Sequence, residues 1–361
     1  MMSNAFLLSR VRLHFADSNP DLVQQLSAIA FSPDGHLWVG SDEFLTIERL
    51  SPLGPNRYGQ HQAFHLGDFL DLADDEAEID IEGLSYSNGY LWVVGSHSAK
   101  RKKPKGKKTG PDAQKDIRRL GKIKQDANRY LLARVPLHEG VPVQSCSESK
   151  DHPRLTAACL GKSSSQNLLL DCLEKDKHLG PFLEVGLPSK DNGFDIEGLA
   201  VNGQQILLGL RGPVLGGWAV ILELELTEGK PGELTFKELD DGLPYRKHFL
   251  DLNGLGIRDL YLHGGDLYLL AGPTMLLPGV MQIFRLRDVL KHQQDTLWPQ
   301  ATDELEWLFD LPYNPSKDNA EGLALFPCLG YEDSLIVLYD APDPERLPDG
   351  SSIFADVFRL P

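Results

Sequence analysis

Cysteine is scarce in this sequence, and long apolar runs are missing. Four cysteines occur among 361 residues, none of them in a C-x-x-C pair, which excludes a disulfide framework and indicates a reducing compartment. No apolar run reaches the roughly 18 residues of a membrane-spanning helix. Arg10 and Arg12 interrupt the apolar start, and no small-residue cleavage site follows. We therefore expect a soluble, cytoplasmic protein that is not exported and has no membrane partner.

Positive charge is in deficit everywhere except in one window. The chain has 36 Lys and Arg against 52 Asp and Glu, a formal net charge of −16. Residues 100–124 hold twelve basic residues against Asp112 and Asp116, so this window carries +10 and the rest of the chain −26. An acidic body makes nucleic acid an improbable partner, and few aromatics accompany the basic residues for base stacking.

Motifs of several common enzyme classes are absent as well. The sequence contains no G-x-S-x-G, no H-E-x-x-H and no dinucleotide-binding fingerprint. Nucleophilic-serine, zinc-peptidase and Rossmann chemistry are therefore not indicated.

One hairpin pattern occurs five times along the chain. Each copy has a short, often acidic entry, an apolar strand, a turn, a second apolar or aromatic strand and a small or polar exit. Asp34-Gly35, Asn88-Gly89, Asn202-Gly203 and Gly264-Gly265 suit turns that need positive φ. The copies span residues 25–43, 80–98, 195–213, 256–273 and 319–342.

Further strands follow each hairpin. The pattern predicts third strands at 44–50, 129–137, 219–226, 281–288 and 353–361, and fourth strands at 58–66, 182–187, 234–239 and 305–311. The last copy ends after its third strand, and residues 5–15 can supply the missing outer strand. Closure of this kind removes exposed sheet edges. We therefore predict an all-β fold, a single β-propeller domain over residues 1–361 with five blades, or six if the long second unit hides a degenerate one.

Two insertions interrupt the repeats. Residues 99–127 form a basic insertion loop, whose first half the charge density predicts to be mobile. Residues 163–178 combine serine caps with apolar positions at helical spacing, which predicts a helical insertion.

Hairpin topology places the start of each first strand and the end of each second strand on one face. Charged side chains recur at these positions, so we predict a site at one mouth of the channel. Two residues before the apolar anchor of each first strand, the five copies have Ser27, Glu82, Glu197, Arg258 and Glu321. Two residues earlier they have Gln25, Asp80, Asp195, Gly256 and Asn319. At the ends of the second strands they have Asp42, His97, Arg211, Ala271 and Asp340.

Carboxylates that converge on an axis must repel, take up protons, pair with arginine or bind a cation. Oxygen ligands without a cysteine or histidine cluster suit Ca²⁺ or Mg²⁺ better than zinc. The alternative is structural, with the repeated glutamates bracing the next blade. The candidate metal ligands are Asp80, Glu82, Asp195, Glu197 and Glu321.

Four further residues are candidates for catalysis. His97 could transfer protons near neutral pH, or it could be an ordinary loop histidine. Arg211 could bind an anionic substrate through its planar fork or pair with a glutamate. Arg258 and Lys100 could stabilise negative charge. The basic run itself is either a solvated loop or a lid that attracts anions.

The repeated D-I-E-G-L, with hairpin ends G-S-H-S-x-K-R-K, L-R-G-P and Y-D-A-P, resembles a family of bacterial propeller proteins of unassigned function over nearly the whole chain. More distantly, D-x-E-G-L resembles an element of the esterase-like phytase propellers. That resemblance implies a channel-mouth site that includes Asp80, Glu82, Asp195 and Glu197, and more weakly Asn319 and Glu321.

Three hypotheses about function follow. The first is a metal-assisted hydrolase of a phosphate or other anionic ester, with Ca²⁺ or Mg²⁺ on the carboxylates. The second is a non-catalytic propeller that binds a small anionic ligand or a protein. The third is polyanion binding through residues 100–124, which predicts a steep dependence on salt.

Overall fold

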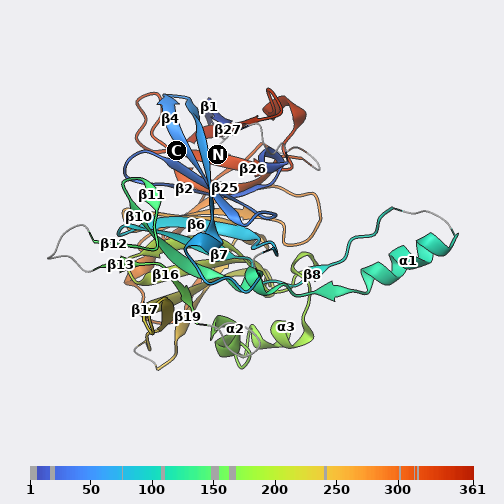
Figure 1. Cartoon of the computed structure of the whole chain (residues 1–361). Coiled ribbons are helices and arrows are strands. Elements are labelled where there is room, and N and C mark those ends of the chain that lie inside the picture. The colour runs from blue at the N-terminus through green and yellow to red at the C-terminus, as the bar shows by residue number, and fades with distance from the viewer. Residues whose placement is uncertain are drawn as a thin grey trace.

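The computed structural model describes residues 6–361 except for 17–20, 75, 107–109, 148–153, 162–167, 240–241, 301, 313 and 315–316. Its first strands lie around a common axis (Figure 1). β2 contacts β6 and β25, β15 contacts β6 and β20, and β20 contacts β25, so the circuit closes. These inner strands are β2 (Leu26–Phe31), β6 (Ile81–Ser87), β15 (Asp195–Asn202), β20 (Gly256–His263) and β25 (Asn319–Leu325).

In each sheet the second strand pairs antiparallel with the inner strand, and the third pairs antiparallel with the second. This arrangement confirms the predicted all-β propeller. The count of five blades, with six as the alternative, stays a prediction of the sequence. The second strands are β3 (Leu37–Ser41), β7 (Tyr90–Gly95), β16 (Gln205–Gly212), β21 (Asp266–Gly272) and β26 (Ser334–Asp340). The third strands are β4 (Thr46–Gly54), β10 (Leu132–His138), β17 (Trp218–Glu228), β22 (Gln282–Leu286) and β27 (Ser352–Arg359).

The outer strands differ in part from the prediction. β5 (Arg57–His65) and β24 (Leu305–Asp310) lie where expected, and β18 (Glu233–Phe236) pairs with the end of β17 and with β14. The strand predicted at 182–187 is wrong, because α3 (Gly180–Val185) begins at Gly-Pro and ends at Gly186 with φ 64°. β14 (Ala158–Leu160) and β19 (Tyr245–Asp251) instead pair with β10 and β17.

The N-terminal strand closes the ring, as predicted. β1 (Phe6–His14) pairs antiparallel with β27 along most of its length and parallel with β5 at Arg12 and Leu13. The last and first sheets therefore become one eight-stranded sheet. Val11 and Leu13 are fully buried, so closure also completes the apolar core at this junction.

The core lies between neighbouring sheets. Trp38 of β3 packs in one cluster with Leu84 and Leu91 of the next sheet. Within the described part of the chain, no helix has the length and apolar character needed to cross a membrane.

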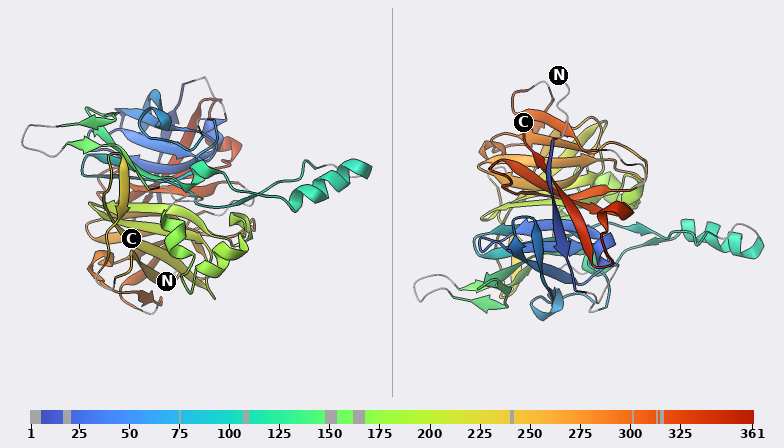
Figure 2. Two further views of the ribbon diagram at one scale, coloured as in Figure 1. Left: turned by 60° about the horizontal axis from the view of Figure 1, so that its bottom comes forward. Right: turned by 90° about the horizontal axis from the view of Figure 1, so that it is seen from above.

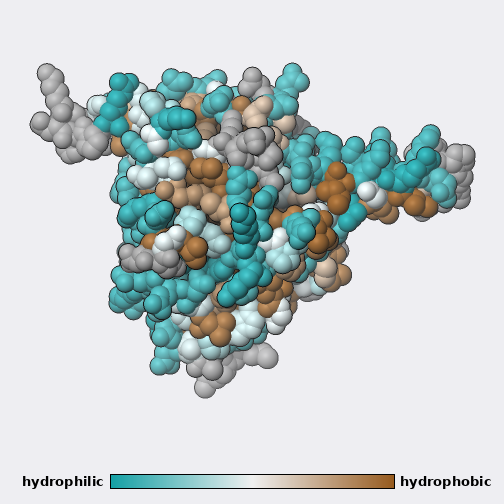
Figure 3. All heavy atoms as spheres, turned by 90° about the horizontal axis from the view of Figure 1, so that it is seen from below, coloured by the Kyte–Doolittle hydropathy of each residue, from teal (hydrophilic) through white to brown (hydrophobic). Residues whose placement is uncertain are grey.

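The basic insertion leaves the propeller as an arm (Figure 2). β8 (Lys100–Arg101) pairs with β9 (Ile123–Lys124), and between them the structure has α1 (Gly110–Leu120), a helix that the sequence did not predict. Figure 3 shows hydrophobic surface along this arm among hydrophilic side chains. Ile117, Leu120 and Ile123 are exposed.

The helix predicted at 163–178 is shorter in the structure. α2 (Leu168–Leu173) lies within that range, α3 follows it, and residues 162–167 lie outside the described part of the chain. The remaining short strands are β11 (Val141–Pro142), β12 (Ser145–Cys146), β13 (Leu155–Thr156) and β23 (Thr296–Trp298).

Candidate functional site

A β-bulge interrupts every inner strand at the same point. The pairing register shifts between Ile81 and Gly83 in β6, for example, which leaves Glu82 as the extra residue. A bulge redirects the side chain of its extra residue out of the regular alternation. The residues at the shifts are those of the predicted row, namely Ser27, Glu82, Glu197, Arg258 and Glu321.

All five predicted metal ligands and their neighbours line one large cavity of about 1010 Å³. The bulged strand starts, the ends of second strands and the base of the arm all contribute to its wall. Because the arm starts at the end of β7, its lysines face the carboxylates across this space. The charged lining includes Asp42, Glu78, Asp80, Glu82, Lys100, Arg101, Lys102, Lys103, Arg129, Asp195, Glu197, Arg211, Glu321 and Asp340.

An ion-pair chain joins three neighbouring inner strands. Arg211 Nη1 lies 2.6 Å from Glu197 Oε1, and Arg258 Nε lies 3.0 Å from Glu197 Oε2. Arg258 also pairs with Glu321 through Nη2. Arg258 is not among the residues that line the cavity, and its guanidinium lies between the carboxylates of Glu197 and Glu321.

A second group of ion pairs lies at the β6 and β7 side. Arg129 pairs with Asp80 and, at 3.4 Å, with Glu78 Oε1. The same guanidinium donates to Ser98 O at 3.1 Å and to Ser98 Oγ at 2.8 Å, which fixes its orientation. Lys100 Nζ lies 2.7 Å from Glu78 Oε1 and reaches the rim of the cavity.

Burial and neighbouring negative charge raise the pKa of several carboxyl groups in the cavity. Burial, reinforced by the negative charges of Glu197 and Asp80, raises the pKa of Glu82 well above its usual range. Burial and Glu197 raise the pKa of Asp195 to about 7. Burial and Asp340 raise the pKa of Asp42 to about 7. Such values suit groups that exchange protons at physiological pH.

Glu82 differs from the other bulge carboxylates in its surroundings. Glu197 and Glu321 are each paired with arginine, whereas no hydrogen bond or ion pair joins Glu82 to any residue that the structure describes. Its side chain is partly exposed and lines the cavity. Glu82 is thus an unpaired carboxyl with a raised pKa, open to whatever enters the cavity.

The carboxylates do not fit a resident divalent cation as they are arranged. Ca²⁺ and Mg²⁺ need several oxygens directed at one point. Among the described residues, no group of three or more His, Cys, Asp or Glu has such an arrangement. Asp80, Asp195, Glu197 and Glu321 are directed at arginines, so Ca²⁺ or Mg²⁺ binding stays a prediction of the sequence.

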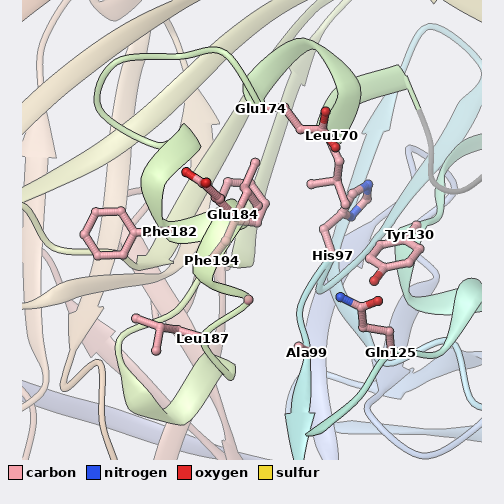
Figure 4. A pocket seen from close by; sticks show the side chains of 12 residues that line it. His97, Ala99, Gln125, Tyr130, Leu170, Glu174, Phe182, Glu184, Leu187 and Phe194 are labelled. Carbon is pink, nitrogen blue, oxygen red and sulfur yellow. The ribbon is translucent and has the colours of Figure 1, made fainter.

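His97 lies apart from the other predicted site residues. β7 ends at Gly95, and two residues later the backbone of His97 has φ 54°. Its Nδ1 lies 2.9 Å from Gly95 O, and it is 2% exposed. Burial lowers the pKa of His97 to about 4, so the imidazole is neutral at pH 7. It lines a separate, smaller cavity with Tyr130 (Figure 4).

Two features of the site were not predicted from the sequence, and a third, Asp42, was predicted by position but not by its pKa. Arg129 precedes a third strand, while the pattern compared only first and second strands. Asp42 appeared in the row of strand ends, but its raised pKa depends on burial that only the fold provides. The exposed apolar run Met275 to Leu277 lines the cavity, and three apolar residues between turn-forming Pro273 and Gly279 could have signalled it.

The ring of inner strands and this charged cavity define a β-propeller with a candidate site at one mouth. The chain belongs to the family described as Protein of unknown function (DUF3616), whose model matches residues 25–356. None of the curated proteins matches the sequence. Similarity to the esterase-like phytases stays a resemblance of the short D-x-E-G-L element.

Solved structures with distant similarity include several enzymes. An aldose sugar dehydrogenase from Streptomyces coelicolor, solved in its PQQ-bound form, is 12% identical with a TM-score of 0.42, over 99% of this chain and 98% of that one. Virginiamycin B lyase from Staphylococcus aureus is 10% identical with a TM-score of 0.36, over 97% and 99% of the two chains.

Proposed function

We propose that the mouth cavity hydrolyses a phosphate or other anionic ester by general acid–base catalysis, with Glu82 as the acid and Asp42 as the base. The observation that carries this proposal is the unpaired carboxyl of Glu82 in a cavity whose wall also holds arginines and lysines, where burial and neighbouring carboxylates raise its pKa. Asp42, with a pKa of about 7, is partly ionised at neutral pH and can accept a proton. Two carboxyl groups with different proton affinities are what acid–base chemistry requires.

The reaction balances without any further reactant than water. Water attacks the carbonyl carbon or phosphorus and gives one proton to the Asp42 carboxylate. The ester oxygen leaves as the bond to it breaks and takes the proton of Glu82. Asp42 then gives its proton to solvent, and Glu82 takes one up from solvent. Both carboxyl groups thereby return to their starting states.

The arginines and lysines of the cavity can bind a negatively charged group of the substrate. Arg129 and Lys100 line the cavity beside Glu82, and the arm adds Arg101, Lys102 and Lys103. Guanidinium groups bind carboxylate and phosphate in a fixed, planar geometry. Cations in a partly buried cavity also stabilise the charge that develops on the attacked group.

The apolar run at the rim fits an organic substrate. Met275, Leu276 and Leu277 are 42%, 70% and 60% exposed and line the otherwise charged cavity. Exposed apolar side chains at a charged pocket can bury the hydrocarbon part of an ester. We therefore expect an ester with both a negative group and an apolar body.

A non-catalytic binding propeller is the second candidate, because one observation favours it. The charges of Arg211, Glu197, Arg258 and Glu321 neutralise one another in a series of ion pairs, as expected of residues that brace neighbouring blades. Such a protein would bind the same anionic ligand class without turning it over.

A panel of chromogenic esters tests the proposal. The panel contains p-nitrophenyl phosphate, bis(p-nitrophenyl) phosphate and the p-nitrophenyl monoester of glutaric acid, with p-nitrophenyl acetate as the neutral comparison. We expect turnover of at least one anionic ester, and a loss of about 10²-fold or more in kcat for Glu82→Gln. Glutamine is neutral like the protonated glutamic acid, so this variant should fold normally.

Asp126→Asn is the matched control, since Asp126 lines the same cavity but pairs only weakly with Lys124 at 3.8 Å. It should keep wild-type rates. Binding of the anionic esters without turnover by the wild-type protein would overturn the hydrolase and support the binding propeller.

A further inference from the structure

A second cavity of about 320 Å³ lies between the end of β7 and the helices α2 and α3. Figure 4 shows His97 and Tyr130 on one side of it and Phe182 and Phe194 on the other. This volume is at the lower end of the range for small-molecule sites, which is about 300–1,000 Å³. The proposed hydrolase does not use this cavity.

The side chains that line this cavity have a definite chemistry. Tyr130, Phe182 and Phe194 present aromatic rings, and Leu170, Leu183 and Leu187 add aliphatic surface. Aromatic faces attract cations through their negative quadrupole, and more strongly where water is excluded.

The charged residues that the structure describes at this cavity are acidic. Glu174 and Glu184 contribute carboxylates, and no described Lys or Arg lines it. His97 is neutral at pH 7 because burial lowers its pKa to about 4. The cavity therefore offers negative charge beside aromatic rings, the opposite of what an anion needs.

The two cavities lie back to back and share their wall. Tyr130 and Phe194 line the small cavity, whereas their chain neighbours Arg129 and Asp195 line the large one. Tyr130 ends a short 3-10 turn that begins at Ala127, and Phe194 directly precedes β15. The small cavity is thus a separate compartment, directly behind the ion pairs of the mouth.

We propose that the small cavity is a second binding site, which takes a small organic cation with an aromatic or aliphatic body. The amine lies near Glu174 and Glu184, and the apolar body packs against Tyr130, Phe182 and Phe194. The mouth cavity selects anions, so the two sites differ in the sign of the ligand they accept.

Calorimetry with phenethylamine as the probe tests this site, with 2-phenylethanol and 3-phenylpropionate as neutral and anionic counterparts of similar shape. We expect phenethylamine to bind at least tenfold more tightly than the alcohol, and no detectable binding of the carboxylate. Equal affinity for all three probes, or no binding of the amine, would overturn the proposal. Because binding is measured directly, the outcome does not depend on whether esters are hydrolysed.

Two kinds of variant locate the binding. Leu183→Trp fills the cavity from α3 and should abolish binding of the amine. The Glu174→Gln, Glu184→Gln pair should weaken it at least tenfold, while a Glu332→Gln, Glu345→Gln pair makes the same change in net charge away from the cavity and should not. If Leu183→Trp does not fold, the glutamine pair alone decides. Amine binding that survives in that pair would place the ligand elsewhere and contradict the proposal.

Discussion

Arg258 Nε lies 3.0 Å from Oε2 of Glu197, and the two residues occupy the same bulge position in neighbouring inner strands. The repeat therefore places opposite charges next to each other at the crowded centre of the ring. Both side chains are at most 5% exposed, so neither charge is well solvated except by its partners. Glu197 binds Arg211 as well, which makes this one carboxylate the link between two arginines.

Removing the Glu197 carboxylate should destabilise the protein strongly. Glu197→Gln leaves two buried guanidinium groups without their shared partner, and we expect a loss of about 3–5 kcal/mol in the free energy of unfolding. Urea denaturation measures this. Lys317→Ala removes an exposed pair with Asp343 and should cost about 1 kcal/mol or less. Equal losses in the two variants would show that the buried chain does not brace the blades.

The stability of the protein should depend on pH through Asp195. Its pKa is about 7 in the folded protein, against about 3.9 in an unfolded chain, so the folded state holds the proton more tightly. The stabilisation is complete below about pH 4 and is lost as the pH rises through 7. Asp195→Asn keeps a neutral side chain, so its Tm should fall less than that of the wild type between about pH 5 and pH 8. Parallel Tm curves in calorimetric scans would contradict the raised pKa.

Divalent cations should bind weakly at the mouth, because binding must displace arginines from Asp80, Glu197 and Glu321. We expect calorimetry with Ca²⁺ or Mg²⁺ to show no saturable site below millimolar concentration, and EDTA to leave the rate of ester hydrolysis unchanged. A tight, stoichiometric site that is lost in a Glu82→Gln, Glu197→Gln double variant would restore the metal-assisted mechanism that the sequence predicts.

The apolar rim should select the substrate. Leu276→Ser removes the most exposed of the three apolar side chains, and we expect KM to rise about threefold to tenfold for esters with a long alkyl body, with kcat little changed. Leu297→Ser is the control, since Leu297 is 60% exposed and does not line the cavity. Equal effects of the two substitutions on KM would show that the apolar rim does not contact the substrate.

The sequence predicts most of the fold because its turn residues and strand alternation are local signals. Asn88-Gly89 and Asn202-Gly203 lie at hairpin turns, and the N-terminal strand pairs with β27 as expected. The segment 182–187 misled the analysis because Phe182 to Gly186 reads as alternating while Pro181 starts a helix. The arm helix α1 was missed because its charge density resembles that of a mobile loop.

The site was predicted only in part, for a physical reason. Periodicity identifies Glu82, Glu197 and Glu321 as equivalent, but it does not show the bulges that redirect them or which of them an arginine will reach. Those contacts join residues far apart in the chain, such as Arg129 and Asp80, 49 positions apart. His97 is adjacent to the site in sequence and yet lines the other cavity, a placement that strand periodicity does not reveal.

The most direct test of the account is the pH dependence of kcat/KM for the best anionic ester. We expect a bell, with a rising limb near pH 7 as Asp42 loses its proton and a falling limb as Glu82 loses its own from a raised pKa. Asp42→Asn should abolish the rising limb and Glu82→Gln the falling one, each with a large loss of rate. A bell of unchanged shape and height in Glu82→Gln would contradict the claim that this carboxyl is the acid.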